Sequence, residues 1–102
     1  MKYFGSIGSG EVTESKSICS GAGFLTSLMV YTDGTNEATV TLYDNKNSAI
    51  GDVLVKVIVS GTSDYGGRIW SDRAFRKFKD GVYAVVSGTG ASCIVEYMKI
   101  SK

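Results

Sequence analysis

The sequence predicts an all-β protein, and two features of its composition carry this prediction. Val, Ile and Thr together are nearly twice as numerous as Leu, Ala and Glu, and branching at Cβ suits a pleated strand better than a helix. The chain has 13 glycines and no proline, so Gly, Asn and Asp must make the turns. We expect an antiparallel β-sandwich or jelly roll of about eight strands.

The strand candidates recur at the spacing that is typical of such a fold. From Ala38 to Tyr43, apolar and polar side chains alternate, which predicts a strand with one buried and one wet face. The expected strands are Lys2–Ile7, Val12–Cys19, Phe24–Thr32, Ala38–Tyr43, Val53–Ser60, Arg68–Phe75, Val82–Ser87 and Cys93–Ile100.

Polar, glycine-containing segments separate these strands. Asp33-Gly34-Thr35-Asn36 predicts a hairpin, because Gly34 takes a positive φ at little cost. Ser87–Gly90 predicts a second turn of the same kind between the last two strands. The polar run Asp44–Gly51 predicts an exposed loop.

The segment Ser71–Asp80 does not follow the alternation, and we expect it to be irregular. A short helical turn capped by Ser71 and ended by Gly81 fits it as well as a strand does. Its basic residues, interleaved with two phenylalanines, could form a surface for single-stranded nucleic acid, but a solvated edge is the commoner role. The basic residues are Arg73, Arg76, Lys77 and Lys79.

Size and charge restrict the class of protein. The 102 residues predict a single domain, 1–102, and the formal net charge of +1 argues against a nucleic-acid partner. The chain has no histidine, which excludes His-dependent catalysis, His-ligated zinc and a histidine pH switch. We therefore expect no enzymatic activity, no catalytic residue and no cofactor. Among the possible functions, a small hydrolase ranks last, because the chain has no histidine. No metal is expected either, although scattered aspartates at one end of a sandwich could hold calcium.

The two cysteines and the apolar runs bear on location. Cys19 and Cys93 are expected to be a buried reduced pair; the alternative is one bridge, which would need an oxidising compartment. The first fifteen residues do not form a secretory signal. The longest apolar run, Val53–Val59, contains Lys56 and is far shorter than the ~20 residues of a membrane helix. We expect synthesis in the cytoplasm without export, and no membrane partner.

Two strands carry apolar residues on both faces, which predicts a second contact surface besides the core. In Val53–Val59 the valines share one parity, and Leu54 and Ile58 share the other with Lys56. In the last strand, Cys93, Val95 and Tyr97 oppose a second apolar set. The expected subunit or partner interface comprises Leu54, Ile58, Ile94, Met98 and Ile100.

Three aromatic residues offer an alternative function. Exposed rings on a sandwich hold sugars in many binding modules, and Tyr43, Tyr65 and Trp70 are the candidates here. A core tryptophan is the commoner role for Trp70.

Two stretches of strand-and-turn pattern cover about half of the chain, outside Ser63–Lys77. They read GFLTSLMVYTDGTNEATVTLYDNKNSAIGDVL and FKDGVYAVVSGTGASCIVEYMK. With them the chain resembles a widespread group of small virion structural proteins of tailed bacteriophages. The matching positions are Gly34, Ala38, Val40, Leu42, Tyr43, Asp44, Ala49, Gly51, Phe78, Gly81, Val82, Tyr83, Ser87, Gly88, Thr89 and Ala91.

The resemblance implies a β-sandwich without catalytic residues that decorates a capsid, forms part of a head fibre or attaches to a tail. The implied partner is a phage capsid or tail protein, and the implied location is the virion. It also implies a homo-oligomer, for which a trimer is expected because particle-bound sandwiches often occupy local three-fold positions.

Overall fold

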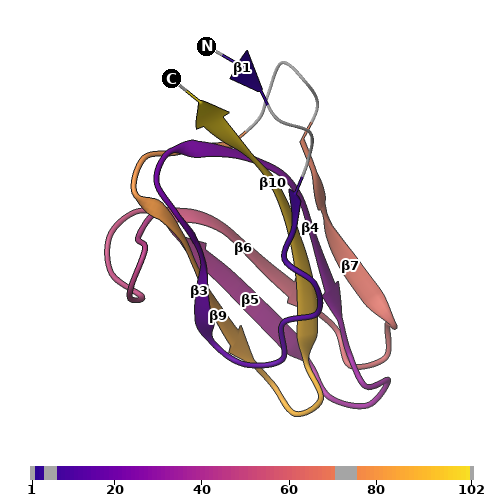
Figure 1. Cartoon of the computed structure of the whole chain (residues 1–102). Helices are drawn as coiled ribbons and strands as arrows, with labels where there is room; N and C mark the ends of the chain where they lie inside the picture. Colours follow the sequence, from indigo (N-terminus) through magenta and orange to yellow (C-terminus); the bar gives the residue numbers. More distant parts are fainter. Residues whose placement is uncertain (1, 4–6, 71–75, 102) are drawn as a thin grey trace.

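Two antiparallel sheets pack face to face and form a β-sandwich (Figure 1). The computed structural model describes residues 2–3, 7–70 and 76–101. One sheet has six strands, in the order β1 (Lys2–Tyr3), β10 (Ser92–Ser101), β4 (Gly23–Tyr31) and β7 (Tyr65–Ile69), with β2 (Ile7–Gly8) beside β10 and β8 (Arg76–Phe78) beside β4. The other has four, in the order β3 (Lys16–Ser20), β9 (Gly81–Ser87), β5 (Ala38–Tyr43) and β6 (Val53–Val59).

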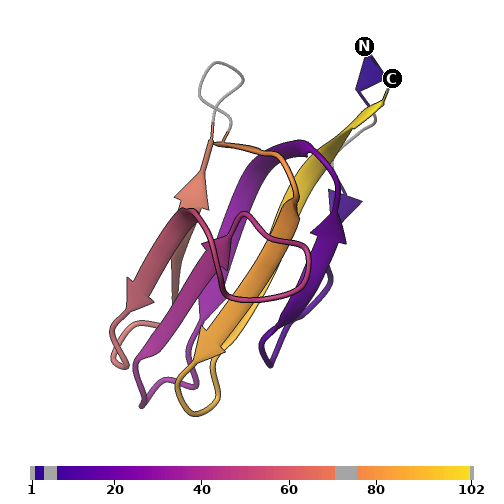
Figure 2. The ribbon, with the colours of Figure 1, turned by 90° about the vertical axis from the view of Figure 1, so that its left-hand side faces the viewer.

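The predicted all-β sandwich is thus confirmed. The described residues form ten strands, two of them only two residues long, where about eight were expected. The four strands of the smaller sheet lie side by side in Figure 2. The sandwich is elongated, with extents of 44 × 26 × 20 Å.

The core lies between the sheets and follows the predicted alternation. In β5, Ala38, Val40 and Leu42 are buried while the residues between them are half-buried. From the opposite sheet, Leu28 and Phe78 have no exposed surface. Close packing requires a glycine at Gly23, since an added Cβ would stand 2.7 Å from the Phe78 ring.

The two predicted hairpins are wrong, because each turn joins strands of different sheets. β4 pairs with β10, β7 and β8, and β5 pairs with β6 and β9, so Asp33–Asn36 carries the chain across the sandwich. Ser87–Gly90 does the same between β9 and β10. The chemistry of the turn itself is as expected: Gly34 has φ +86.

The Asp33 carboxylate holds the first of these turns together. It accepts hydrogen bonds from the Asn36 N–H at 2.7 Å, the Thr35 N–H at 2.9 Å and the Asn36 side-chain amide at 2.8 Å. These bonds, the Asn36 backbone bond first, lower the pKa of Asp33. The second turn packs against the first, since an added Cβ on Gly90 would lie 2.6 Å from the Asp33 Cβ.

Several strand boundaries differ from the prediction. The expected strand Val12–Cys19 begins later, at Lys16, because Val12 instead exchanges backbone hydrogen bonds with Cys93 of the opposite sheet. The expected first strand is replaced by β1 and β2, with residues 4–6 outside the described part.

The stretch around Ser71–Asp80 also differs. The expected strand Arg68–Phe75 is replaced by β7, which begins earlier, at Tyr65, and ends at Ile69. Arg76–Phe78 forms β8 and pairs with Gly23–Leu25, where we expected irregular structure. Ser71–Phe75, which include Arg73, lie outside the described residues.

Candidate functional site

Three of the five predicted interface residues share the outer face of the six-stranded sheet. Along β10, Cys93 and Val95 are fully buried, whereas Ile94, Met98 and Ile100 have the opposite parity and are half-buried. The predicted division of β10 into an inner and an outer apolar set therefore holds for these residues. Since the inner set already fills the core, the outer set is available for a second contact.

Leu54 and Ile58 do not belong to that face. Leu54 is only 8% exposed, because the register of β5 and β6 shifts between Leu42 and Tyr43 and leaves Leu54 as an extra residue that turns inward. Ile58 is 58% exposed but lies on β6, in the four-stranded sheet. Placing these two residues in one interface with Ile94 was wrong.

Neighbouring strands extend the apolar surface around Ile94 and Met98. The antiparallel register places Met29 opposite Ile94 and Phe24 opposite Met98. On β7, Tyr65 is 63% and Ile69 78% exposed. We call the resulting surface the apolar outer face; its residues are Phe24, Met29, Tyr31, Tyr65, Ile69, Ile94, Met98 and Ile100.

One polar contact interrupts the apolar outer face. The Ser27 hydroxyl donates a hydrogen bond of 2.8 Å to the Glu96 carboxylate, and the two residues lie opposite each other on β4 and β10. A cross-strand pair of this kind stabilises the sheet and places a carboxylate on the face.

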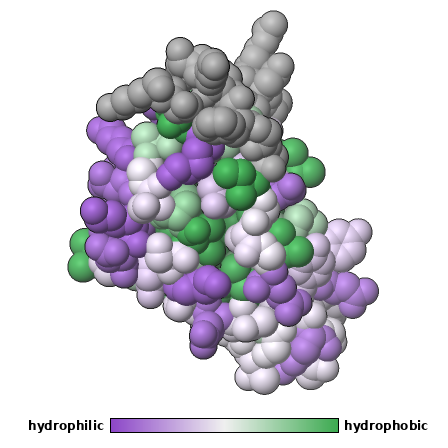
Figure 3. All heavy atoms as spheres, in the orientation of Figure 1, coloured by the Kyte–Doolittle hydropathy of each residue, from purple (hydrophilic) through white to green (hydrophobic). Residues whose placement is uncertain are grey.

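Figure 3, in the orientation of Figure 1, shows hydrophobic residues reaching the surface in the middle of the visible side, with hydrophilic residues around them.

The three aromatic residues predicted to bind a sugar do not form one surface. Trp70 is 9% exposed and packs in the core, with the Arg68 guanidinium carbon 5.7 Å from its ring centroid. Tyr65 lies at the end of the sandwich where Ala38 begins β5, whereas Tyr43 ends β5 at the other end. Tyr65 instead contacts Tyr31, with ring centroids 6.5 Å apart and an interplanar angle of 44°.

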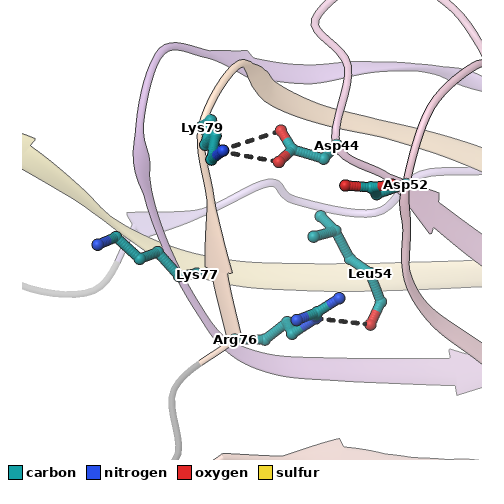
Figure 4. A pocket seen from close by; sticks show the side chains of 6 residues that line it. All are labelled: Asp44, Asp52, Leu54, Arg76, Lys77 and Lys79. Atoms are coloured by element: carbon teal, nitrogen blue, oxygen red, sulfur yellow. Dashed lines mark hydrogen bonds between the residues drawn. The ribbon is translucent and has the colours of Figure 1, made fainter.

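A polar hollow of about 220 Å³ opens where the β5–β6 loop meets β8 (Figure 4). The Asp44 carboxylate accepts hydrogen bonds from the backbone N–H groups of Lys79, at 3.0 and 3.1 Å, and Asp80, at 2.9 Å. The lining residues are Asp44, Asp52, Leu54, Arg76, Lys77 and Lys79.

Arg76 closes the other side of this hollow. Its Nε donates to the Leu54 carbonyl oxygen at 3.1 Å and a terminal nitrogen to that of Val53 at 3.4 Å. In Figure 4 the Arg76 guanidinium points toward Leu54, while the Lys77 side chain points away from the other lining residues. Asp44 and Arg76 thus join the two sheets, which is a structural task.

Sequence reasoning missed this role of Arg76, which we expected on a solvated edge. A usable signal exists: Arg76 and Phe78 share a face of β8 by parity, and Phe78 is fully buried. An arginine on the inward side of a strand end is placed to bond open carbonyl groups of the facing sheet.

The remaining candidates for chemistry are the two cysteines and the acidic residues. Both cysteines are free thiols; burial raises the pKa of the Cys93 thiol to about 11 and also raises that of Cys19. Within residues 2–3, 7–70 and 76–101, no group of three Cys, Asp or Glu side chains is placed to hold a metal ion. The same residues include no helix long and apolar enough to cross a membrane.

Comparison with protein-family models, with curated proteins and with solved structures finds no match. The site is therefore interpreted from its own geometry, and the apolar outer face is its main feature.

Proposed function

We propose that the chain is a non-enzymatic structural protein of a phage virion, which docks on a capsid or tail protein through the apolar outer face. One observation supports the proposal most directly. The inner face of the six-stranded sheet is already complete, with Leu28, Val30 and Val95 fully buried, and the outer face is nevertheless apolar. A sheet face of this composition, opposite a core that is already filled, is typical of a protein contact.

The geometry of the face suits docking on a repetitive protein surface. Its residues come from adjacent strands of one sheet, so their relative positions are fixed by the backbone ladder. Binding then costs little ordering of loops. The Ser27–Glu96 pair supplies a polar point inside an apolar area, as in protein interfaces where a few hydrogen bonds fix the orientation.

The proposal is tested by putting charge on the face. The double variant Ile94→Lys, Met98→Glu has the same net charge as the unmodified protein. Its docking would remove two charged side chains from water, which is unfavourable. We expect at least a tenfold loss of binding to candidate phage particles, measured by co-sedimentation.

The matched control is Thr39→Lys with Thr41→Glu, which places the same charges on the outward side of β5 in the other sheet. It should bind particles as the unmodified protein does. Equal binding by both double variants, each folded by circular dichroism, would contradict the proposed docking face.

Sugar binding is the alternative, and exposure of Tyr65 next to Tyr31 is the observation that favours it. Trp70 is 9% exposed and does not present its ring to solvent. A glycan array probed with the unmodified protein and with Tyr65→Ala separates the functions: sugar binding that disappears in a folded Tyr65→Ala variant supports the alternative.

A further inference from the structure

The edge strand β7 directs alternate backbone groups away from its own sheet. Thr32 donates its N–H to the Asp64 carbonyl oxygen at 3.0 Å, and Trp70 donates its N–H to Thr26 at 3.0 Å. Opposite residues of an antiparallel pair of strands alternate between hydrogen-bonded and non-hydrogen-bonded pairs. The backbone groups that face β4 are therefore those of every second residue: Asp64, Gly66, Arg68 and Trp70. Tyr65, Gly67 and Ile69 therefore point their N–H and C=O groups outward, where no other strand of the described residues pairs with β7.

β7 lacks the register shift that interrupts the edge strands β3 and β6. The edge strands β3 and β6 each carry a register shift, between Ser17 and Cys19 and beside Leu54, and each carries a lysine. β1 and β2 are two residues long. β7 carries Arg68 but pairs with β4 in unbroken register over its full length of five residues, and a regular edge is a template for another strand.

We propose that β7 pairs antiparallel with β7 of a second copy of this chain, about a two-fold axis at Gly67. In this register Tyr65 lies opposite Ile69 of the second copy and Gly67 opposite Gly67. These are the residues whose backbone groups point outward, so every one of them finds a partner. The contact is the same patch on both copies, which closes the assembly at two subunits.

The side chains fit this register. On the outer side, Tyr65 and Ile69, the two most exposed residues of the apolar outer face, lie next to each other across the contact. Gly67 places no side chain at the axis, and Met29 fills the space above it, since an added Cβ on Gly67 would stand 2.7 Å from the Met29 Sδ.

Charges are complementary on the opposite side of β7. Asp64 and Arg68 share one parity, and the register places Asp64 diagonally opposite Arg68 of the second copy, once on each side of the axis. Diagonal neighbours across antiparallel strands are within reach of a long side chain.

This dimer is independent of the particle that the protein docks to, and it differs from the trimer that the resemblance implies. It joins the two six-stranded sheets edge to edge and continues the apolar outer face across the axis.

The test removes one outward N–H. In Ile69→Pro the lost N–H makes no bond to β4, and proline is tolerated at edge positions of this kind. We expect the unmodified protein to have twice the 10.9 kDa chain mass by light scattering. Ile69→Pro should raise the dissociation constant of the dimer at least about tenfold, and the control Ile69→Thr, which keeps the N–H, should remain a dimer.

Amide hydrogen exchange on the unmodified protein gives a second readout that does not depend on a variant. At high concentration the amides of Tyr65, Gly67 and Ile69 should be protected; on dilution to the monomer they should lose protection, while Gly66 and Arg68 keep theirs. A monomer or trimer at high concentration, a dimer that survives in folded Ile69→Pro, or fast exchange at all three outward amides would overturn the proposal.

Particle binding separates this inference from the proposed function. If Ile69→Pro is monomeric and still co-sediments with particles, the docking face stands without the dimer being needed for it. If the unmodified protein is monomeric yet binds particles, only the dimer is wrong.

Discussion

The two outer faces of the sandwich differ although the two inner faces are alike. Inward, both sheets present Val, Leu and Ala side chains that are almost fully buried. Outward, the four-stranded sheet mixes the polar residues Thr39, Thr41 and Lys56 with the apolar residues Val53, Ile58 and Val85. The six-stranded sheet carries the apolar outer face.

This difference shows which apolar residues the fold itself requires. Apolar side chains interspersed with polar ones are ordinary on a protein surface, whereas a continuous apolar run across adjacent strands is not. The fold is satisfied by one apolar parity in each strand, so the second parity in β10 and β4 points to an intermolecular contact.

The largest effect is expected where a strand of the six-stranded sheet faces inward. Leu28→Ala should lower the free energy of unfolding by about 3–5 kcal/mol, because Leu28 is fully buried and its removal leaves a cavity. Its neighbour Met29 faces outward, and Met29→Ala should cost about 1 kcal/mol or less. Urea unfolding measures both, and equal losses would contradict the assignment of faces.

The buried thiol of Cys93 should make stability depend on pH in the alkaline range. Burial raises the pKa of Cys93 in the folded protein to about 11 from an ordinary value of 9.0, so above pH 9 the unfolded chain ionises while the folded chain does not. The contribution of Cys93 to stability should fall by about 2–3 kcal/mol between pH 9 and 11 and stay constant above that range. In Cys93→Ala this part of the decline should be absent; an unchanged alkaline profile would argue against the burial effect.

A smaller effect is expected at the tie between the sheets. Asp44→Ala removes the acceptor for the backbone N–H groups of Lys79 and Asp80, which should cost about 1–3 kcal/mol in thermal or urea unfolding. Asp52→Ala, which removes an exposed carboxylate from the same hollow, is the control and should stay near zero.

The smallest effect belongs to the four-stranded outer face. Ile58→Thr should change the free energy of unfolding by no more than about 0.5 kcal/mol, because the side chain is 58% exposed. Particle binding and mass in solution should also be unchanged. A loss of either would place a contact on the face that we regard as inert.

Local patterns were sufficient for the strands but not for their pairing. β5 has the predicted bounds Ala38–Tyr43, because strict alternation reports one buried face directly. The two turns misled us, because a turn with Gly at a positive φ looks the same whether the following strand pairs with the preceding one or crosses to the other sheet. Only long-range packing distinguishes the two cases.

The candidate site was predictable to the same degree. The outer parity of β10 came from the sequence, since no irregularity interrupts that strand between Cys93 and Glu96. Leu54 was misplaced because a bulge shifts the parity by one residue and sequence alternation cannot show it. Tyr31, Met29 and Phe24 were missed because β4 becomes the neighbour of β10 only through a contact between distant segments.

The crossing turns also affect when the protein can fold during synthesis. β4 ends at Tyr31, and its central neighbour β10 begins only at Ser92. While the ribosome makes the intervening segment, β4 exposes Leu25, Leu28 and Val30 without the strand that covers its edge. Pairing over such sequence distances is slow, and unpaired apolar strands aggregate. The nascent chain therefore has its greatest need of a chaperone just before β10 emerges.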